Sequence, residues 1–166
     1  MTRAMFVTVL YRLAGKPGVT GDNPFADVGA SSWYYDPVLW AVEKGITSGT
    51  SASTFSPDEP VTREQMTVFL YRYAKMMGDT FNVQNLRPEH GTLSTWAEAE
   101  SLWALSAGLL SGVKAVMENP QDYAPRSLLA VAIANYTHLA QEGGLGFIGP
   151  LPFKDVKVSD SYYESK

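Results

Sequence analysis

Residues 62–74 read Thr-Arg-Glu-Gln-Met-Thr-Val-Phe-Leu-Tyr-Arg-Tyr-Ala, and residues 2–14 read Thr-Arg-Ala-Met-Phe-Val-Thr-Val-Leu-Tyr-Arg-Leu-Ala. The two stretches align without gaps at an offset of 60, and six of the 13 aligned positions are identical. Self-similarity at a fixed period is the sequence signature of a repeat architecture. In the second stretch, apolar side chains recur at helical spacing. The pattern therefore predicts a helix that occurs more than once in this chain.

Two further matches define the repeating unit. At an offset of 63, residues 33–49 recur as residues 96–112 and share two Trp, a Leu, an Ala, two Gly and a Ser. At an offset of 128, residues 25–35 recur as residues 153–163. The unit is about 60 residues long. We expect one domain over residues 1–166, with these parts: the second half of copy one at 2–18, a complete copy two at 25–78, a divergent copy three at 91–141 and the start of a further copy at 153–166.

Local signals predict two helices and a loop in each copy. Thr62 and Gln65 fit a capping box, in which each side chain bonds a free backbone N–H group of the first helical turn. Asp36 followed by Pro37 predicts an N-cap and the first position of a shorter helix. That helix is expected to end at Gly45 in the left-handed conformation. The loop over residues 46–60 follows, with Phe55 as its apolar anchor.

Three long helices are expected near residues 2–15, 62–77 and 125–141. Each has one apolar stripe, and three such stripes are buried most simply against one another. The predicted fold is therefore mainly α, with a central three-helix bundle and loop-rich lobes around it. The first lobe would be incomplete, because the chain opens midway through a copy.

Composition excludes several classes of protein. The chain has 166 residues, 13 Lys plus Arg against 17 Asp plus Glu, and no Cys. A formal net charge of -4 argues against a nucleic-acid binder, which normally has a basic face. Without Cys there is no disulfide framework, thiolate metal site or Cys nucleophile. No apolar run reaches the length of a membrane-spanning helix. We expect no nucleic-acid partner and no membrane insertion.

Catalytic and metal-binding patterns are also lacking. The two histidines, His90 and His138, have no second His at metal-ligand spacing and no nucleophile motif to complete a triad. Glu98 and Glu100 stand two apart on a predicted helix and so point in different directions. We expect no enzyme, no metal site and no cofactor. Because residues 2–14 are repeated inside the chain, we interpret them as a folded helix rather than a signal peptide, so an export signal is expected to be absent from this chain.

The repeat resembles the surface-layer homology (SLH) domain of bacterial cell-surface proteins. The resemblance rests on the order and spacing of these elements: Phe25-x-Asp27-Val28, Trp33-Tyr34, Val38-x-Trp40-Ala41, Gly45-Ile46-x-x-Gly49, Phe55-x-Pro57, Thr62-Arg63-Glu64-Gln65 and Leu70. It covers nearly the whole chain apart from the linkers near 78–90 and 142–152. Copy three departs from the pattern, since Pro125-Arg126-Ser127 stands where copy two has Thr-Arg-Glu.

The resemblance implies a fold and a function. SLH repeats fold into a pseudo-threefold, mostly helical body with a central bundle and three lobes. They hold exported proteins non-covalently on bacterial cell-wall polysaccharide, typically a secondary polymer with pyruvylated amino sugars, in grooves between lobes. The resemblance therefore implies a secreted, extracellular, wall-associated anchoring module of the S-layer type, whose partner is a carbohydrate.

Candidate glycan-binding residues follow from the family motif and from physical reasoning. An Arg at a helix start can grip a carboxylate beside free N–H groups. Glycines let a backbone approach a sugar, and aromatic rings offer a face for a pyranose. The candidates are Arg63, Arg3, Thr62, Gly45, Ser48, Gly49, Trp33, Trp40 and Arg126.

Other interpretations of these residues stay open. Large aromatics dominate core energetics, so core packing is the favoured role of both Trp33 and Trp40. Arg63 could instead pair with Asp58 or Glu59 on the surface, a contact worth about 0–1 kcal/mol. At the level of function, the alternatives are a structural or protein-interaction module that has lost glycan binding, and part of a cell-wall hydrolase. Self-association through the incomplete lobe is also open.

Overall fold

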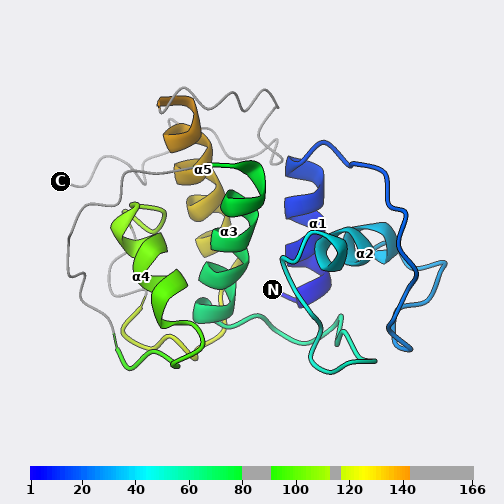
Figure 1. Cartoon of the computed structure of the whole chain (residues 1–166). Helices are drawn as coiled ribbons and strands as arrows, with labels where there is room; N and C mark the ends of the chain where they lie inside the picture. The colour runs from blue at the N-terminus through cyan, green and yellow to red at the C-terminus, as the bar shows by residue number, and fades with distance from the viewer. Residues whose placement is uncertain (80–90, 113–116, 143–166) are drawn as a thin grey trace. The chain divides into compact units, whose positions relative to one another are not determined.

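Residues 1–79, 91–112 and 117–142 are described by the computed structural model (Figure 1). This part of the chain forms five helices and no strands. The helices are α1 (Arg3–Leu13), α2 (Tyr35–Glu43), α3 (Arg63–Met77), α4 (Glu98–Ser106) and α5 (Arg126–Glu142). The mainly-α prediction is therefore confirmed. The expected start of a further copy at 153–166 lies outside the described residues.

The chain divides into two compact units. The N-terminal unit is Met1–Val61 and holds α1 and α2; the C-terminal unit is Thr62–Lys166 and holds α3, α4 and α5. The division falls inside the second sequence copy, directly before its long helix. Each unit therefore joins the long helix of one copy to the short helix and loop of the next. The pseudo-threefold arrangement and the central bundle remain predictions.

The ends of the helices follow the sequence signals, with one exception. Thr62 and Gln65 form the predicted capping box, and Gly45 has a φ of 69°. The exception is α2, which begins at Tyr35 without a side-chain cap, so the predicted N-cap at Asp36 is wrong. Asp36 instead lies in the first turn, where a carboxylate is favoured by the helix dipole and Pro37 removes an N–H that has no partner within the helix.

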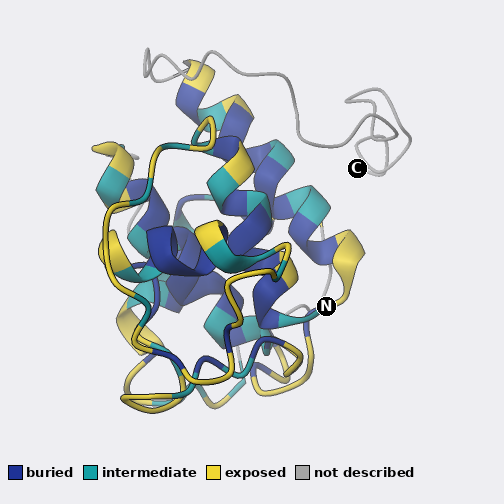
Figure 2. Cartoon of the chain, turned by 90° about the vertical axis from the view of Figure 1, so that its right-hand side faces the viewer, coloured by how far each residue is buried: buried dark blue, intermediate teal, exposed yellow. Residues whose placement is uncertain are grey.

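Each unit contains buried apolar side chains from its own helices, and Figure 2 colours the chain by burial. In the N-terminal unit α1 packs on α2, and Phe55 is fully buried as the predicted loop anchor. In the C-terminal unit α3 packs on α4, and α5 meets α3 through the rings of Tyr73 and Tyr136, whose centroids are 5.5 Å apart. Both units thus pair a long helix with the short helix of the next copy.

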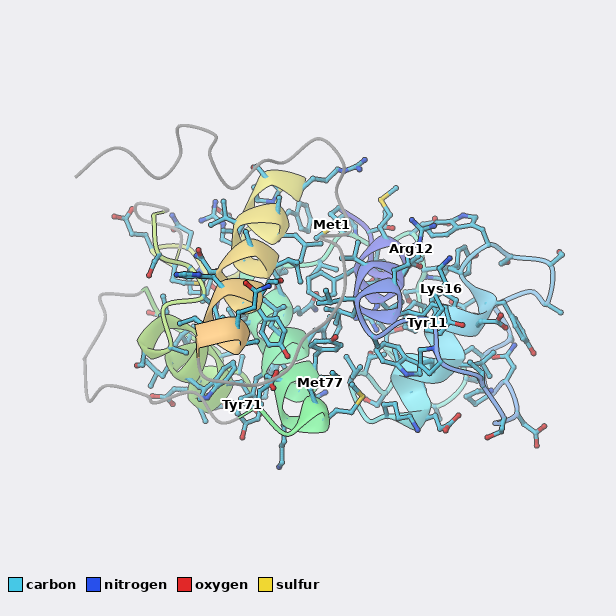
Figure 3. The ribbon with its side chains drawn as sticks, turned by 90° about the horizontal axis from the view of Figure 1, so that it is seen from above. Met1, Tyr11, Arg12, Lys16, Tyr71 and Met77 are labelled. Carbon is cyan, nitrogen blue, oxygen red and sulfur yellow. The ribbon has the colours of Figure 1, made fainter. Side chains whose placement is uncertain are left out.

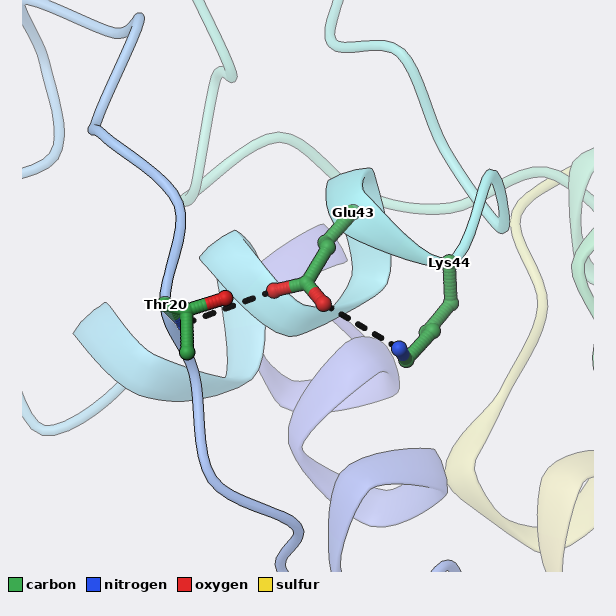
Figure 4. A network of polar contacts seen from close by, with 3 residues as sticks. All are labelled: Thr20, Glu43 and Lys44. Atoms are coloured by element: carbon green, nitrogen blue, oxygen red, sulfur yellow. Dashed lines mark hydrogen bonds and ion pairs between the residues drawn. The ribbon is translucent and has the colours of Figure 1, made fainter.

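A surface contact ties the segment between α1 and α2 to the end of α2 (Figure 4). Glu43 accepts a hydrogen bond from the backbone N–H of Thr20 at 3.5 Å and pairs with Lys44 at 3.1 Å. The bond from Lys44 lowers the pKa of the Glu43 carboxyl. Exposed pairs of this kind contribute little to stability. The contact therefore adds little to the stability of this segment.

Candidate functional site

The start of α1 is bound to the loop that follows α2. The backbone N–H of Arg3 donates to the carbonyl of Glu59 at 2.9 Å, and that of Ala4 donates to the carbonyl of Pro57 at 3.0 Å. The next N–H group, that of Met5, donates to the side chain of the N-cap residue Thr2. The first N–H groups of this helix are therefore used inside the unit.

The start of α3 repeats these contacts in the C-terminal unit. The N–H of Arg63 donates to the carbonyl of Asp122 at 2.9 Å, and that of Glu64 donates to the carbonyl of Pro120 at 3.0 Å. The cap residue Thr62 accepts from the N–H of Gln65 at 3.2 Å. The sequence suggested that these helix starts offer free N–H groups to an anion. In the structure these N–H groups donate to carbonyls of the neighbouring loop and to the side chain of the cap residue instead.

The side chain of Arg3 is buried inside the N-terminal unit. It is 4% exposed and donates from Nε to the carbonyl of Phe55 at 2.9 Å and from Nη2 to Thr47 Oγ1 at 3.2 Å. Its guanidinium also lies 4.9 Å from the centre of the Phe55 ring. Burial lowers the pKa of Arg3, and the carboxylates of Glu59 and Asp27 oppose that shift. These contacts give Arg3 a structural role.

Asp27 holds the same loop from another side. Its carboxylate accepts from the backbone N–H of Phe55 at 2.9 Å and of Ser56 at 2.7 Å. Although desolvation opposes the shift, these two hydrogen bonds keep the pKa of Asp27 below its usual value. Ser56 has a φ of 59°, a conformation uncommon outside glycine. The carboxylate thus stabilises a strained turn of the loop.

Arg63 lies nearer to solvent than its counterpart. Its side chain is 22% exposed, and Nη1 lies 3.8 Å from the Asp122 carboxylate and 3.4 Å from the carbonyl of Asn119. Within the C-terminal unit, the carboxylate beside Arg63 is therefore that of Asp122. Arg126 lies at the first position of α5 and is exposed. These two arginines keep access to solvent that Arg3 lacks.

The glycines of the candidate loop differ in their roles. Gly49 has a φ of 82°, and a Cβ there would lie 2.6 Å from both the Phe25 ring and the carbonyl of Thr54. Gly49 is therefore required by the packing of its own loop. Gly45 ends α2, and no atom lies within 4 Å of a Cβ built on it. Ser48 is exposed between them.

The two tryptophans have opposite environments. Trp40 is 1% exposed and packs edge-on against Tyr11 at 5.6 Å, so its predicted core role is confirmed and no ring face is left for a sugar. Trp33 is 61% exposed, so the preferred core interpretation is wrong for this residue. The cause is position: Trp33 precedes α2, whereas Trp40 lies on its buried face.

Trp33 borders a pocket that the sequence analysis missed. The pocket has a volume of about 340 Å³ and lies between the last turn of α1 and the segment before α2. Tyr11, Arg12 and Lys16 line it from the side of α1. The repeated Tyr-Arg pair at 11–12 and 71–72 was the available signal, but it was assigned to the helix alone. Within the described ranges there is no group of three metal-ligating side chains, and no helix is long and apolar enough to cross a membrane.

Comparisons with known proteins identify one family. Residues 24–67 match the family model described as the S-layer homology domain. The surface-layer 125 kDa protein of Lysinibacillus sphaericus is 38% identical over 88 residues, which are 52% of this chain and 6% of that protein. An endoglucanase of Bacillus sp. (strain KSM-635) is 32% identical over 120 residues, or 72% of this chain and 12% of that protein.

A third relative matches almost the whole chain. Cell surface glycoprotein 1 of Acetivibrio thermocellus is 28% identical over 170 aligned residues, which cover 96% of this chain and 7% of that protein. The chain thus spans between 6% and 12% of the length of these three relatives. The resemblance drawn from the motif at 25–70 is confirmed, and the chain carries an S-layer homology domain.

Proposed function

We propose that this chain anchors an exported protein to the bacterial cell wall by binding a secondary wall polysaccharide without covalent attachment. The observation that carries the proposal is the S-layer homology domain at residues 24–67, supported by relatives named as surface-layer and cell-surface proteins. The chain would act outside the cell, in association with the wall. We further propose that the ligand is acidic, as a pyruvylated amino sugar would be, and that it binds in grooves between lobes.

Among the residues of the motif, Arg63 and Arg126 are the best placed to meet an acidic polymer. Arg63 is only partly exposed, and its contact with Asp122 is long at 3.8 Å. A carboxylate with good geometry would compete with such a contact, because a planar guanidinium binds carboxylates through two parallel hydrogen bonds. Arg3 supports the proposal indirectly, since it holds the loop that presents Ser48.

Sedimentation with purified wall polymer tests the proposal. The parent chain should sediment with the polymer, and an Arg63→Ala, Arg126→Ala double variant should be weaker. Lys44→Ala is the matched control, because Lys44 is an exposed cation that pairs with Glu43. A double variant that sediments like the parent would show that these arginines do not bind the polymer. A parent chain that stays in solution would contradict anchoring itself.

The second candidate function is a protein-interaction module that has kept the fold and lost the glycan. Copy three favours it, because Leu110 stands where copy two has Thr47, and the position of Glu64 is taken by Ser127. Calorimetry with a pyruvylated disaccharide separates the two functions. Heat of binding at millimolar ligand supports the anchor; its absence, together with binding to a protein partner, supports the module.

Catalysis is not part of the proposal. The segment that matches this chain makes up 12% of the endoglucanase. The name of that protein is therefore no argument for catalysis by this chain. We assign the chain an anchoring role with no enzymatic activity and no cofactor. Self-association is not proposed, because no feature of residues 1–79, 91–112 and 117–142 supports it.

A further inference from the structure

The pocket beside Trp33 lies wholly within the N-terminal unit. Arg12 and Lys16 line it from the end of α1 and from the residues just after it, and Figure 3 shows their labels grouped with that of Tyr11 beside the helix. Trp33 lines it from the segment that leads into α2, and Asp36 lines it from the first turn of α2. The pocket is far along α1 from Arg3, which begins the helix. Trp33 is therefore the one motif candidate that lines this pocket, and the motif arginines Arg3, Arg63 and Arg126 do not.

Trp33 supplies the pocket with a large exposed ring. The indole is 61% exposed, and it is held edge-on by Tyr34, with ring centroids 5.1 Å apart and planes at 85°. Tyr11 is fixed in the same way by the buried Trp40. Rings with restrained orientation bind a flat apolar surface at low entropic cost. The C–H face of a pyranose is such a surface, and its hydroxyls would remain free to bond polar groups.

Two cations give the pocket a charge opposite to that of the chain. Arg12 and Lys16 are both exposed, and neither forms an ion pair with a residue that the structure describes. Asp36 is the one carboxylate among the lining residues, and it suits acceptance of a sugar hydroxyl. The chain as a whole carries a net charge of -4. The lining thus combines two cations with one acceptor for a hydroxyl group, which suits an anion that carries hydroxyls.

The backbone at Lys16 provides a second observation. Lys16 has a φ of 56° and follows Gly15, whose φ is 82°. A bulky residue rarely adopts this conformation, and such strain gathers where function requires it. Here the N–H of Lys16 bonds the carbonyl of Tyr11 at 2.9 Å, which closes the end of the helix. A glycine would satisfy the same turn without strain, so a lysine at this position supports a role for its side chain.

We propose that this pocket binds a sugar residue that carries a carboxylate, with Trp33 against the ring and Arg12 and Lys16 at the carboxylate. The inference rests on the proposed function, because a wall polymer with acidic sugars would supply such a residue repeatedly. It adds a site at the end of α1, where none of the motif arginines lies.

The C-terminal unit offers a matched control. The position of Trp33 is taken by Trp96, which is 52% exposed, and that of Arg12 by Arg72. Lys16 is replaced by Met76, and Tyr35 by Glu98. This second set keeps the ring but has one cation fewer and one carboxylate more. It should therefore not bind an anionic sugar.

The first experiment titrates the whole chain with a pyruvylated amino-sugar disaccharide and with the methyl ester of the same compound. Indole N–H resonances are followed by NMR after assignment with single Trp→Phe variants. The Trp33 resonance should shift to saturation, the Trp96 resonance should stay fixed, and the ester should bind about tenfold more weakly because its charge is removed. A fixed Trp33 resonance at millimolar disaccharide, or equal binding of acid and ester, overturns the inference. This experiment uses the unmodified chain for binding.

The second experiment separates this inference from the proposed function. Arg12→Gln with Lys16→Gln should weaken binding of the disaccharide about tenfold, and Trp96→Ala should leave it unchanged, with thermal melts to check folding. If the parent sediments with wall polymer and the disaccharide ignores the pocket, the inference falls and anchoring stands. If the Trp33 resonance responds and the parent does not sediment, the pocket stands and anchoring falls.

Discussion

The N-terminal and C-terminal units have the same backbone contacts and opposite buried charges. At the start of α1 the buried charged side chain is Arg3, followed by Ala4, and both are almost fully covered. At the start of α3 the order is reversed. Glu64 is 4% exposed and accepts from Ser94 N, Ser94 Oγ and Gln121 Nε2 at 3.0 to 3.3 Å, while Arg63 turns toward solvent.

A hydrogen-bond acceptor at one position of the loop is present in the N-terminal unit and absent from the C-terminal unit. Thr47 offers a hydroxyl that accepts a hydrogen bond from Arg3, whereas the aligned Leu110 is apolar and buried. A buried guanidinium needs acceptors, so Arg63 cannot take the place of Arg3 without an orphaned donor. The two units therefore share their backbone hydrogen bonds and apolar stripes. The buried charged side chain differs between them, since it is Arg3 in one unit and Glu64 in the other.

Removal of Arg3 should cause the largest loss of stability. Arg3→Ala removes one donor each from the carbonyl of Phe55 and from the hydroxyl of Thr47, and it opens space beside the Phe55 ring. We expect a loss of about 3 kcal/mol in the N-terminal unit. Arg63→Ala, which removes a more exposed contact, should cost no more than about 1 kcal/mol. Hydrogen exchange resolved by helix measures the two losses, and equal losses would contradict the contrast.

Alkaline pH should act on the C-terminal unit. Burial, and then Asp79, raise the pKa values of Tyr73 and Tyr136 well above their ordinary value of 10.0. Above pH 10 the unfolded tyrosines lose protons that the folded ones keep, so stability falls as pH rises, by up to about 1.4 kcal/mol per tyrosine and pH unit. Near-UV circular dichroism of urea melts from pH 9 to 11.5 follows this loss. Tyr136→Phe should reduce the slope, and an unchanged slope would refute the assignment.

Removal of Glu64 tests the buried charge of the C-terminal unit. Glu64→Ala leaves the donors of Ser94 and Gln121 without their shared acceptor, which we expect to cost about 2 kcal/mol. Glu64→Gln keeps one oxygen and should recover part of that loss. Urea unfolding of the three chains provides the measurement. If the Gln variant were less stable than the Ala variant, the carboxylate would not be the favourable group that the contacts indicate.

A buried hydroxyl pair provides a finer test. Thr67 donates to the carbonyl of Glu64, so its 2.7 Å contact with Ser101 has Ser101 as the donor. The aligned positions in the N-terminal unit are Val7 and Val38, both fully buried. Thr67→Val alone should cost about 1 kcal/mol because it orphans a hydroxyl, while the Val–Val double variant should be close to neutral. A double-mutant cycle measures the coupling, and additive losses would rule it out.

Acid should act on the N-terminal unit, with the smallest effect. The folded pKa of Asp27 lies below its usual value of 3.8, so its contribution is present above that pH and is lost as pH falls through the lowered value. The parent and Asp27→Asn should therefore differ in stability at pH 5 and converge near pH 2. Thermal melts across this range test the direction, and a gap that widens toward pH 2 would be the wrong sign.

Much of the fold could be predicted because the repeat offsets reflect which backbone groups pair in each unit. Offsets of 60 for the long helices and 63 for the loops correspond to the register in which the N–H of Arg3 meets Glu59 and that of Arg63 meets Asp122. The capping box at Thr62 and the left-handed Gly45 follow from local rules that hold without tertiary context. Helix type and helix ends were therefore accessible from the sequence, apart from the start of α2.

The candidate site was less predictable, because burial depends on tertiary contacts. Trp33 and Trp40 are the same residue type within one motif, and only the packing of α2 on α1 separates an exposed ring from a covered one. Arg3 and Arg63 are likewise equivalent in the motif, but Arg3 is buried and donates to Thr47, where the other unit has the apolar Leu110. The pocket at Lys16 combines segments that the repeat pattern assigns to different copies.

The half-copy offset between sequence repeat and compact unit has a consequence for how such arrays can be edited. Inserting or deleting one whole copy keeps the alternation of long helix and receiving loop in phase, wherever the cut is made. Deleting half a copy joins two long helices or two loops in succession and leaves carbonyls such as those of Pro57 and Glu59 without donors. Recombination within these arrays should therefore preserve phase, as splicing preserves a reading frame, while remaining indifferent to the copy in which it begins.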